Sequence, residues 1–265
     1  INVGLNNKKI GIIKEYFIKK LQSLYLFSKQ NPLLLILLVL SCFYFIYQHL
    51  ISIPWDFSAY VMNARYLFYG GDYFELYRAP LTSLILSPLL LLKRAGEVIY
   101  IIFVSILFLY SNVRLSAVLF NETEKFSRKN IRFIFYFFSL SSFVLIYGFS
   151  TGSELLNLIF INLFLAFFLS GRTSGHFLAL AFLSRYNSLI LLPLVLFTKD
   201  IKKIIWNFLL FLAVIFPWFF YNFLVYGNWF ASFIDSYTLN IHLRDYLFQE
   251  FSWYMLLPLI NWFFI

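Results

Sequence analysis

The chain has 265 residues, of which 62% are hydrophobic and only 12% are charged. Soluble domains carry about 25% charged residues, so this composition excludes a water-soluble globular domain and a disordered chain, and it indicates an integral membrane protein. The formal net charge of +9 comes from 21 Lys and Arg against 12 Asp and Glu. Because these charges stand between apolar segments, we interpret the excess as a signal of membrane orientation and not of nucleic-acid binding.

Residues 1–31 predict a cytoplasmic segment that lies on the membrane surface. Apolar residues such as Ile10, Ile13 and Phe17 recur there at helical spacing among many lysines, as in an interfacial helix. Basic residues beside a span stay in the cytoplasm. The uncharged residues 32–53 are long enough to cross the hydrocarbon, which takes about 20 residues. We therefore expect this first span to emerge on the outer side.

A polar outer loop, residues 54–80, follows the first span. The next apolar segment, Leu81–Leu92, is short for a crossing, and we expect an interfacial or re-entrant helix on the outer side. The alternative is that Leu81–Leu92 crosses, which would invert everything downstream. That inversion would place most of the later positive clusters outside, so the charge pattern excludes it.

The remaining spans are assigned so that the basic clusters between them fall on the inner side. We expect spans over residues 97–118, 131–149, 155–170 and 204–224, and a last one that starts near Ser252. Residues 174–198 predict a hairpin of two short helices that breaks near residues 184–187 and returns to the inner side. The inner side then holds 15 basic and four acidic residues and the outer side six basic and eight acidic ones. The sequon at residues 121–123 is expected to be cytoplasmic and unglycosylated.

The predicted fold class is all-α, a polytopic transmembrane helix bundle over residues 32–265. No Pro/Gly-rich linker divides it, and no internal repeat stands out. The chain starts at Ile1 and ends inside an apolar stretch at Ile265. We therefore expect it to be a piece of a longer protein whose C-terminal part is missing.

Charged residues at the outer end of the bundle are the candidates for chemistry, because such residues are costly near lipid. Asp56 directly follows the first span; the alternative interpretation is a helix N-cap. Glu154 begins the span over 155–170, where a carboxylate also favours the helix dipole. Asp72 and Glu75 are expected to solvate the outer loop.

Two arginines complete the set of charged candidates. Arg185 lies in the break of the hairpin, where a guanidinium suits a phosphate through paired hydrogen bonds; the alternative is an ion pair with an outer-face acid. Arg78 precedes Pro80 and has a similar but more water-exposed position. Trp55, Trp218 and Trp229 fall near the outer interface, as in an aromatic belt.

Four motifs occur in order along the chain. They are DFSAYVMNARYLFYGG at 56–71, YRAPL at 77–81, GxxxAxAxLSRYNSLILLP at 175–193 and FPWFFYNFLVYGN at 216–228. Together they resemble the N-terminal membrane module of the GT-C glycosyltransferases. The resemblance is to the branch of the dolichyl-phosphate-mannose–protein mannosyltransferases and the bacterial lipid A aminoarabinose transferases, and it covers about residues 32–230.

The resemblance implies a hexosyltransferase that takes a sugar from a polyprenyl- or dolichyl-phosphate carrier on the non-cytoplasmic side. The sugar goes to a protein, lipid or glycan hydroxyl, usually with inversion. Asp56 takes the place of the base; the family often has Asp-Glu here, whereas this chain has Asp56-Phe57, so a second acid comes from elsewhere or is unnecessary. Arg185 and Arg78 would contact the carrier phosphate.

The same resemblance sets the other expectations about the site. Glu154 matches an outer-end polar position of the module. Tyr60 and Asn187, which lie inside two of the motifs, are further substrate-binding candidates. The outer acids suit Mg²⁺ or Mn²⁺, but no ligand spacing indicates a metal, and the sequence requires no cofactor.

The rival hypothesis is a non-enzymatic membrane protein, namely a transporter, a flippase or an assembly subunit of an envelope glycan pathway. A transporter is expected to have paired half-repeats with broken helices. This sequence predicts a single broken hairpin, at residues 184–187, with no counterpart in the other half.

Overall fold

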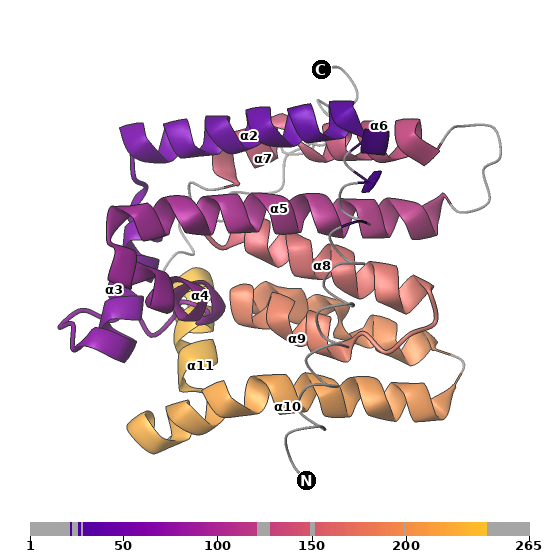
Figure 1. Ribbon diagram of the computed structural model, residues 1–265. Coiled ribbons are helices and arrows are strands. Elements are labelled where there is room, and N and C mark those ends of the chain that lie inside the picture. Colours follow the sequence, from indigo (N-terminus) through magenta and orange to yellow (C-terminus); the bar gives the residue numbers. More distant parts are fainter. Residues whose placement is uncertain are drawn as a thin grey trace, which may run out of the picture.

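The computed structural model describes residues 29–120, 128–148, 152–198 and 200–242, together with residues 22, 26 and 27. All elements in these ranges are helical. Three of the helices are long and apolar enough to span a membrane, namely α2 (Pro32–Ile51), α5 (Arg94–Leu119) and α10 (Ile201–Tyr226). They lie roughly parallel to one another (Figure 1). The predicted all-α class is confirmed, and the predicted spans over residues 32–53, 97–118 and 204–224 coincide with these three helices. The helix at the predicted span 155–170 has 16 residues and is not one of the three.

The long helices turn large apolar side chains outward. Helix α2 has 20 residues, which at 1.5 Å per residue is about 30 Å, the thickness of the hydrocarbon. Phe43 and Tyr47 on α2 and Leu224 on α10 are each more than 60% exposed. Water-soluble monomers rarely expose continuous apolar faces of this extent. These faces are suited to contact lipid.

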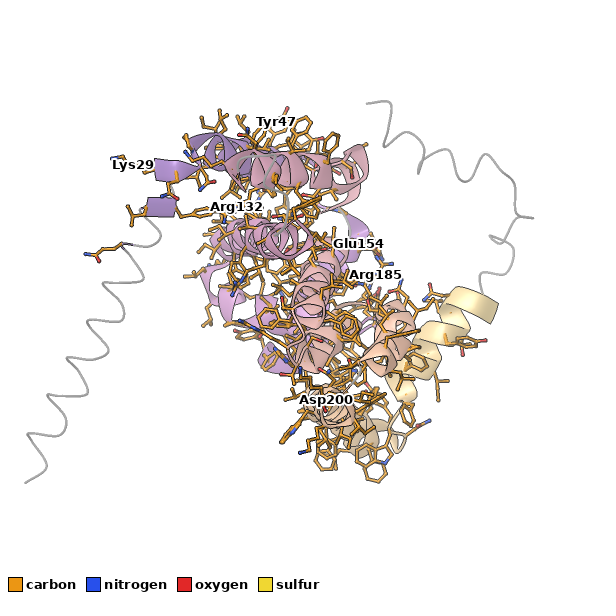
Figure 2. The ribbon with its side chains drawn as sticks, turned by 90° about the vertical axis from the view of Figure 1, so that its right-hand side faces the viewer. Lys29, Tyr47, Arg132, Glu154, Arg185 and Asp200 are labelled. Carbon is orange, nitrogen blue, oxygen red and sulfur yellow. The ribbon has the colours of Figure 1, made fainter. Side chains whose placement is uncertain are left out.

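The helices pack side by side, with α5 and α9 at the centre of the contacts. Helix α5 packs against α2, α6 (Arg128–Ser139) and α8 (Glu154–Leu169), and α9 (Gly175–Ser184) contacts both α8 and α10. A hydrogen bond of 2.8 Å between His49 Nε2 and Glu97 Oε2 joins the end of α2 to the start of α5. Figure 2 shows this arrangement along the helix axes.

Consecutive long helices run in opposite directions (Figure 1). We call the end of the bundle with α3 (Trp55–Tyr69), the start of α8 and the last turn of α10 the site end. The opposite end, with the last turn of α5 and the start of α10, is the basic end. Most of the described Lys and Arg residues are at the basic end, namely Lys29, Arg114, Arg128, Lys129, Arg132, Arg172, Lys202 and Lys203. Among the described acids, only Asp200 joins them there.

Two short segments lie where the sequence predicts them. Helix α4 (Leu81–Leu89) continues into the 3₁₀ turn η1 (Leu90–Leu92) and lies across the long helices (Figure 1), in keeping with a segment that does not cross. The hairpin consists of α9 and the 3₁₀ helix η2 (Tyr186–Phe197), and Arg185 between them has extended backbone. The break therefore falls within the predicted residues 184–187.

One predicted span is interrupted. Instead of a continuous helix over residues 131–149, α6 ends at Ser139 and α7 (Ser142–Tyr147) begins after a break. The Ser141 side chain accepts a hydrogen bond from the backbone of Val144 and caps α7, which is the usual way in which a serine restarts a helix. The surface segment up to residue 21, the sequon and the span near Ser252 lie outside the described residues.

Candidate functional site

Asp56 lies in the first turn of α3, at the site end. The helix begins at Trp55, its N-cap residue is Pro54, and no side chain caps it. The interpretation of Asp56 as an N-cap is therefore wrong. Its carboxylate, 42% exposed, instead accepts a hydrogen bond of 2.7 Å at Oδ1 from Nη2 of Arg78.

Arg78 lies in the segment 70–80, between α3 and α4, and connects this segment with α3. Its side chain is only 9% exposed and donates from Nη2 to Asp56 and from Nε to Glu75. The guanidinium also lies over the rings of Tyr60 and Tyr77, at 5.2 and 5.3 Å from their centroids. Burial lowers the pKa of Arg78, but the hydrogen bonds to Glu75 and Asp56 outweigh it and raise the pKa above its ordinary value. Arg78 is thus a fixed cation that orients the Asp56 carboxylate.

The sequence suggested that Glu75 solvates the loop, but its side chain is buried, with 7% of its surface exposed. It accepts hydrogen bonds from Tyr73, from Tyr77 at 2.5 Å and from Arg78. Its backbone pairs with the Asn63 amide at 2.8 and 3.0 Å. Burial raises the pKa of Glu75, but the donors Tyr73, Tyr77 and Arg78 outweigh burial and lower it. The sequence signal for the buried Glu75 is the spacing Tyr-x-Glu-x-Tyr-Arg, which places a tyrosine two residues before and two residues after the carboxylate.

The pKa values of the two loop phenols, Tyr73 and Tyr77, are raised, whereas that of Glu75 is lowered. Burial and the hydrogen bond to Glu75 raise the pKa of Tyr77 to about 12. The hydrogen bond to Glu75 likewise raises the pKa of Tyr73. Both phenols therefore remain protonated donors. Asp72, by contrast, is exposed, as the sequence predicts for a loop residue.

Glu75 makes the loop sensitive to acid. Its folded pKa lies below the unfolded value of about 4.3, so its contacts stabilise the loop above that pH and are lost as the pH falls through the lower folded pKa. We expect amides of residues 70–80 to be protected from hydrogen exchange between about pH 5 and 8 and to lose protection below about pH 4. The Glu75→Gln variant is expected to be less protected throughout and to lack this acid step.

The control for this experiment is Asp72→Asn, because Asp72 is an exposed acid three residues away in the same loop. This variant is expected to keep the acid step. Hydrogen exchange followed by mass spectrometry, corrected for intrinsic rates, measures both variants. An acid step of unchanged size in Glu75→Gln would contradict the assignment.

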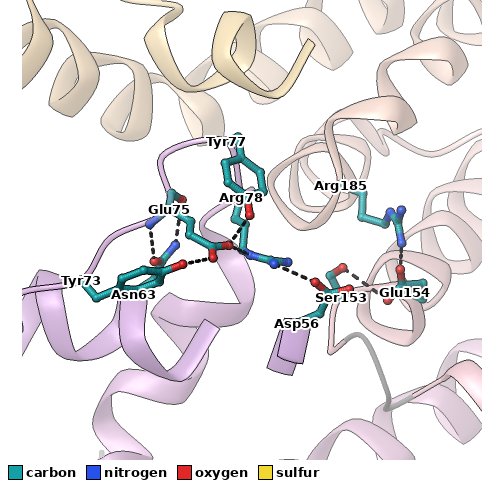
Figure 3. Close-up of polar contacts among 9 residues, drawn as sticks. All are labelled: Asp56, Asn63, Tyr73, Glu75, Tyr77, Arg78, Ser153, Glu154 and Arg185. Atoms are coloured by element: carbon teal, nitrogen blue, oxygen red, sulfur yellow. Dashed lines mark hydrogen bonds and ion pairs between the residues drawn. The ribbon is translucent and has the colours of Figure 1, made fainter. Parts of the chain in front are cut away.

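A second ion pair forms between two other segments at the site end. Glu154, the first residue of α8, pairs with Nη1 of Arg185 at the tip of the hairpin. Figure 3 shows the two side chains directed toward one another. The alternative for Arg185, an ion pair with an outer-face acid, is thus present. Both side chains keep contact with solvent, with Arg185 37% and Glu154 19% exposed.

The Asp56–Arg78 pair and the Glu154–Arg185 pair both line one cavity of about 350 Å³. All six predicted site residues line it: Asp56, Tyr60, Arg78, Glu154, Arg185 and Asn187. They come from three regions that are far apart in the sequence, namely α3 with the segment 70–80 that follows it, the start of α8, and the tip of the hairpin. The sequence did not single out the other lining residues, which are Tyr77, Ala79, Ser153, Ser184, Tyr186, Ser236 and Asn240.

A buried polar cluster holds Tyr186, a lining residue of the cavity, at the hairpin tip. Trp218, predicted at the lipid interface, is 7% exposed, and its Nε1 donates to Tyr186 at 3.1 Å and to Ser232 at 3.0 Å. Asn222 donates to the same serine at 2.8 Å. The belt interpretation is therefore wrong for Trp218, because a buried indole N–H needs a partner and finds it in the hairpin and α11 (Ala231–Tyr237). Trp55 is 70% exposed.

Within the described ranges, no three His, Cys, Asp or Glu side chains converge on a point that could hold a metal ion. Asp56 and Glu154 each have an arginine partner instead. Comparison of the chain with protein-family models, curated proteins and solved structures found no match.

Proposed function

We propose that the chain is an integral-membrane glycosyltransferase of the GT-C type. It takes a sugar from a polyprenyl-phosphate carrier and transfers it to a hydroxyl of a protein, lipid or glycan. The observation that carries this proposal is the cavity at the site end, on which a solvent-accessible carboxylate, Asp56, and a solvent-accessible guanidinium, Arg185, both open. A site of this kind beside the ends of membrane helices suits a substrate with a polar head and an apolar tail.

Asp56 supplies the base in this mechanism. As the acceptor oxygen bonds to the anomeric carbon, the bond from that carbon to the phosphate oxygen breaks. The acceptor proton passes to the Asp56 carboxylate, and the electron pair of the broken bond stays on the polyprenyl phosphate. Arg78 holds Oδ1 of Asp56, so the second carboxylate oxygen is the one available to the acceptor.

The two arginines of the site have different roles in this mechanism. Negative charge grows on the phosphate as it leaves, and a positioned guanidinium stabilises that charge most in the transition state. Arg185 is the more exposed of the two and binds the phosphate, while Glu154 holds it in place. Arg78, whose contacts go to Asp56 and Glu75, acts as a positioning residue for the base. Tyr60 and Asn187 line the space left for the sugar.

The distribution of charge supports an orientation for this reaction. Because basic residues stay on the cytoplasmic side, the basic end faces the cytoplasm in our proposal, and the site end faces the opposite compartment. The donor then enters from the outer leaflet with its tail in the bilayer. No nucleotide site is needed, because the donor carries its sugar on a lipid phosphate.

An assay on the purified protein in nanodiscs tests the proposal. With polyprenyl-phosphate sugars and a hydroxyl acceptor, we expect release of polyprenyl phosphate. In Arg185→Gln, kcat/KM is expected to fall about 100-fold or more. Arg185→Lys is expected to retain an intermediate activity, because it keeps the charge without the two-pronged geometry.

Arg65→Gln provides the matched control, because Arg65 is an exposed arginine on α3 that does not line the cavity. It should have wild-type kinetics. Full activity of a folded Arg185→Gln protein would contradict the phosphate role. Movement of intact donor across a proteoliposome membrane without cleavage would favour the transporter hypothesis instead.

A further inference from the structure

A second and larger cavity lies at the basic end, away from the candidate site. It has a volume of about 460 Å³ and lies between the last turns of α5 and α8 and the turn that leads into α9. Two arginines line it, Arg114 of α5 and Arg172 of the turn. This cavity has no part in the glycosyl transfer proposed above.

The two arginines are available for a ligand. Arg114 is exposed, and its Nε donates to the hydroxyl of Tyr110 at 3.1 Å. The rings of Tyr110 and Phe167 lie 5.6 and 6.0 Å from its guanidinium carbon. Aromatic rings at this distance hold a guanidinium in place without neutralising it. Arg172 is also exposed, and within the described ranges neither arginine forms an ion pair with a carboxylate.

The rest of the lining sets the chemistry of the ligand. None of the lining residues is acidic, and apart from Ser170 the residues beside the arginines are apolar: Ala117, Val118, Leu119, Ala166, Phe167 and Leu169. The nearest acids in the sequence, Glu122 and Glu124, lie outside the described residues. Two cationic side chains beside apolar ones suit a molecule with an anionic head and a hydrocarbon chain.

We propose that this cavity binds the headgroup of an anionic phospholipid. The phosphate contacts Arg114 and Arg172 through charge-assisted hydrogen bonds, and an acyl chain lies along the apolar residues of α5 and α8. Basic pockets between membrane helices at the level of the headgroups recognise such lipids in this way. A free phosphate shares the anionic chemistry but gains nothing from the apolar wall, which favours the lipid.

Native mass spectrometry of the purified protein tests this inference, with phosphatidylglycerol, phosphatidylcholine and inorganic phosphate as separate probes. We expect retention of phosphatidylglycerol and little retention of the other two. The variant Arg114→Gln/Arg172→Gln is expected to bind phosphatidylglycerol about tenfold more weakly. The charge-conserving variant Arg114→Lys/Arg172→Lys is expected to keep most of the affinity. It controls for the effect of the two substitutions on folding of the cavity.

Arg132→Gln is the matched control, because Arg132 belongs to the same end, contacts the ring of Phe27 and does not line the cavity. It should bind phosphatidylglycerol as the wild type does. Equal retention of the two phospholipids, or undiminished phosphatidylglycerol binding by the double glutamine variant, would overturn the inference. Inorganic phosphate bound as tightly as the lipid would overturn it as well, because the site would then be one for a soluble anion.

Discussion

Replacing Asp56 with Asn is expected to lower the rate of sugar transfer by about 10²–10⁴-fold, the contribution of a positioned general base. Asparagine has nearly the same size as aspartate, and its side-chain oxygen still accepts the hydrogen bond that Arg78 donates at 2.7 Å. The geometry of the loop should therefore survive, while the oxygen that takes the acceptor proton is lost. Initial rates in nanodiscs at saturating donor measure the effect on kcat.

The control is Asp72→Asn, which removes an exposed acid of the outer loop that does not line the cavity. Its kcat should stay within twofold, or about 0.4 kcal/mol, of the wild-type value. The KM for the donor should change little in Asp56→Asn, since the carrier phosphate is held by Arg185 in our proposal. A folded Asp56→Asn protein with wild-type kcat would remove Asp56 from the mechanism.

Replacing Gly175 with Ala is expected to destabilise the fold strongly. A Cβ at this position would lie 1.9 Å from the backbone oxygen and 2.7 Å from the backbone carbon of Asn207 in α10. Neither atom can move without shifting the helix, and overpacking of this kind costs about 1–3 kcal/mol or more. The Asn207 side chain also accepts from the backbone N–H groups of Ser174 and Gly175, at 2.6 and 2.9 Å. The substitution therefore disturbs the cap of α9 as well.

Gly227→Ala is the comparison for this variant. Gly227 has φ of +68°, but no atom lies within 4 Å of the added Cβ, so only the backbone cost of about 1 kcal/mol applies. Thermal unfolding in detergent should place Gly175→Ala well below Gly227→Ala. Equal unfolding temperatures for the two variants would contradict the close contact between α9 and α10.

The sequence predicts the long helices well, because a helix that crosses the bilayer needs about 20 apolar residues. Residues 32–53 and 204–224 are uncharged or nearly so over a full crossing, and the structure has α2 and α10 there. The break at Arg185 was also predictable, since a charge inside an apolar hairpin needs an irregular backbone with access to water. The interruption after Ser139 was missed, because one serine cap in an aromatic-rich run has a weak signal.

The candidate site was predictable as a set of residues but not as a set of contacts. The cost of a charge near lipid singles out Asp56, Glu154 and Arg185 one by one. It does not indicate that Arg185 pairs with Glu154, because that contact depends on how the hairpin packs against α8. Trp218 was misjudged for the same reason, whereas the side-chain partners of Glu75 stand within three residues of it and were overlooked. A buried polar group is recognised only when its partners are known, and those of Trp218 lie in other elements.

In our proposal the cavity between Asp56 and Arg185 holds the sugar donor. A cryo-electron microscopy structure of the protein with a non-hydrolysable polyprenyl-phosphonate sugar locates the donor. We expect the phosphonate within hydrogen-bond distance of the Arg185 guanidinium and the anomeric carbon on the side of the Asp56 carboxylate. A donor bound with its phosphonate at Arg114 and Arg172, or bound away from both cavities, would contradict this proposal.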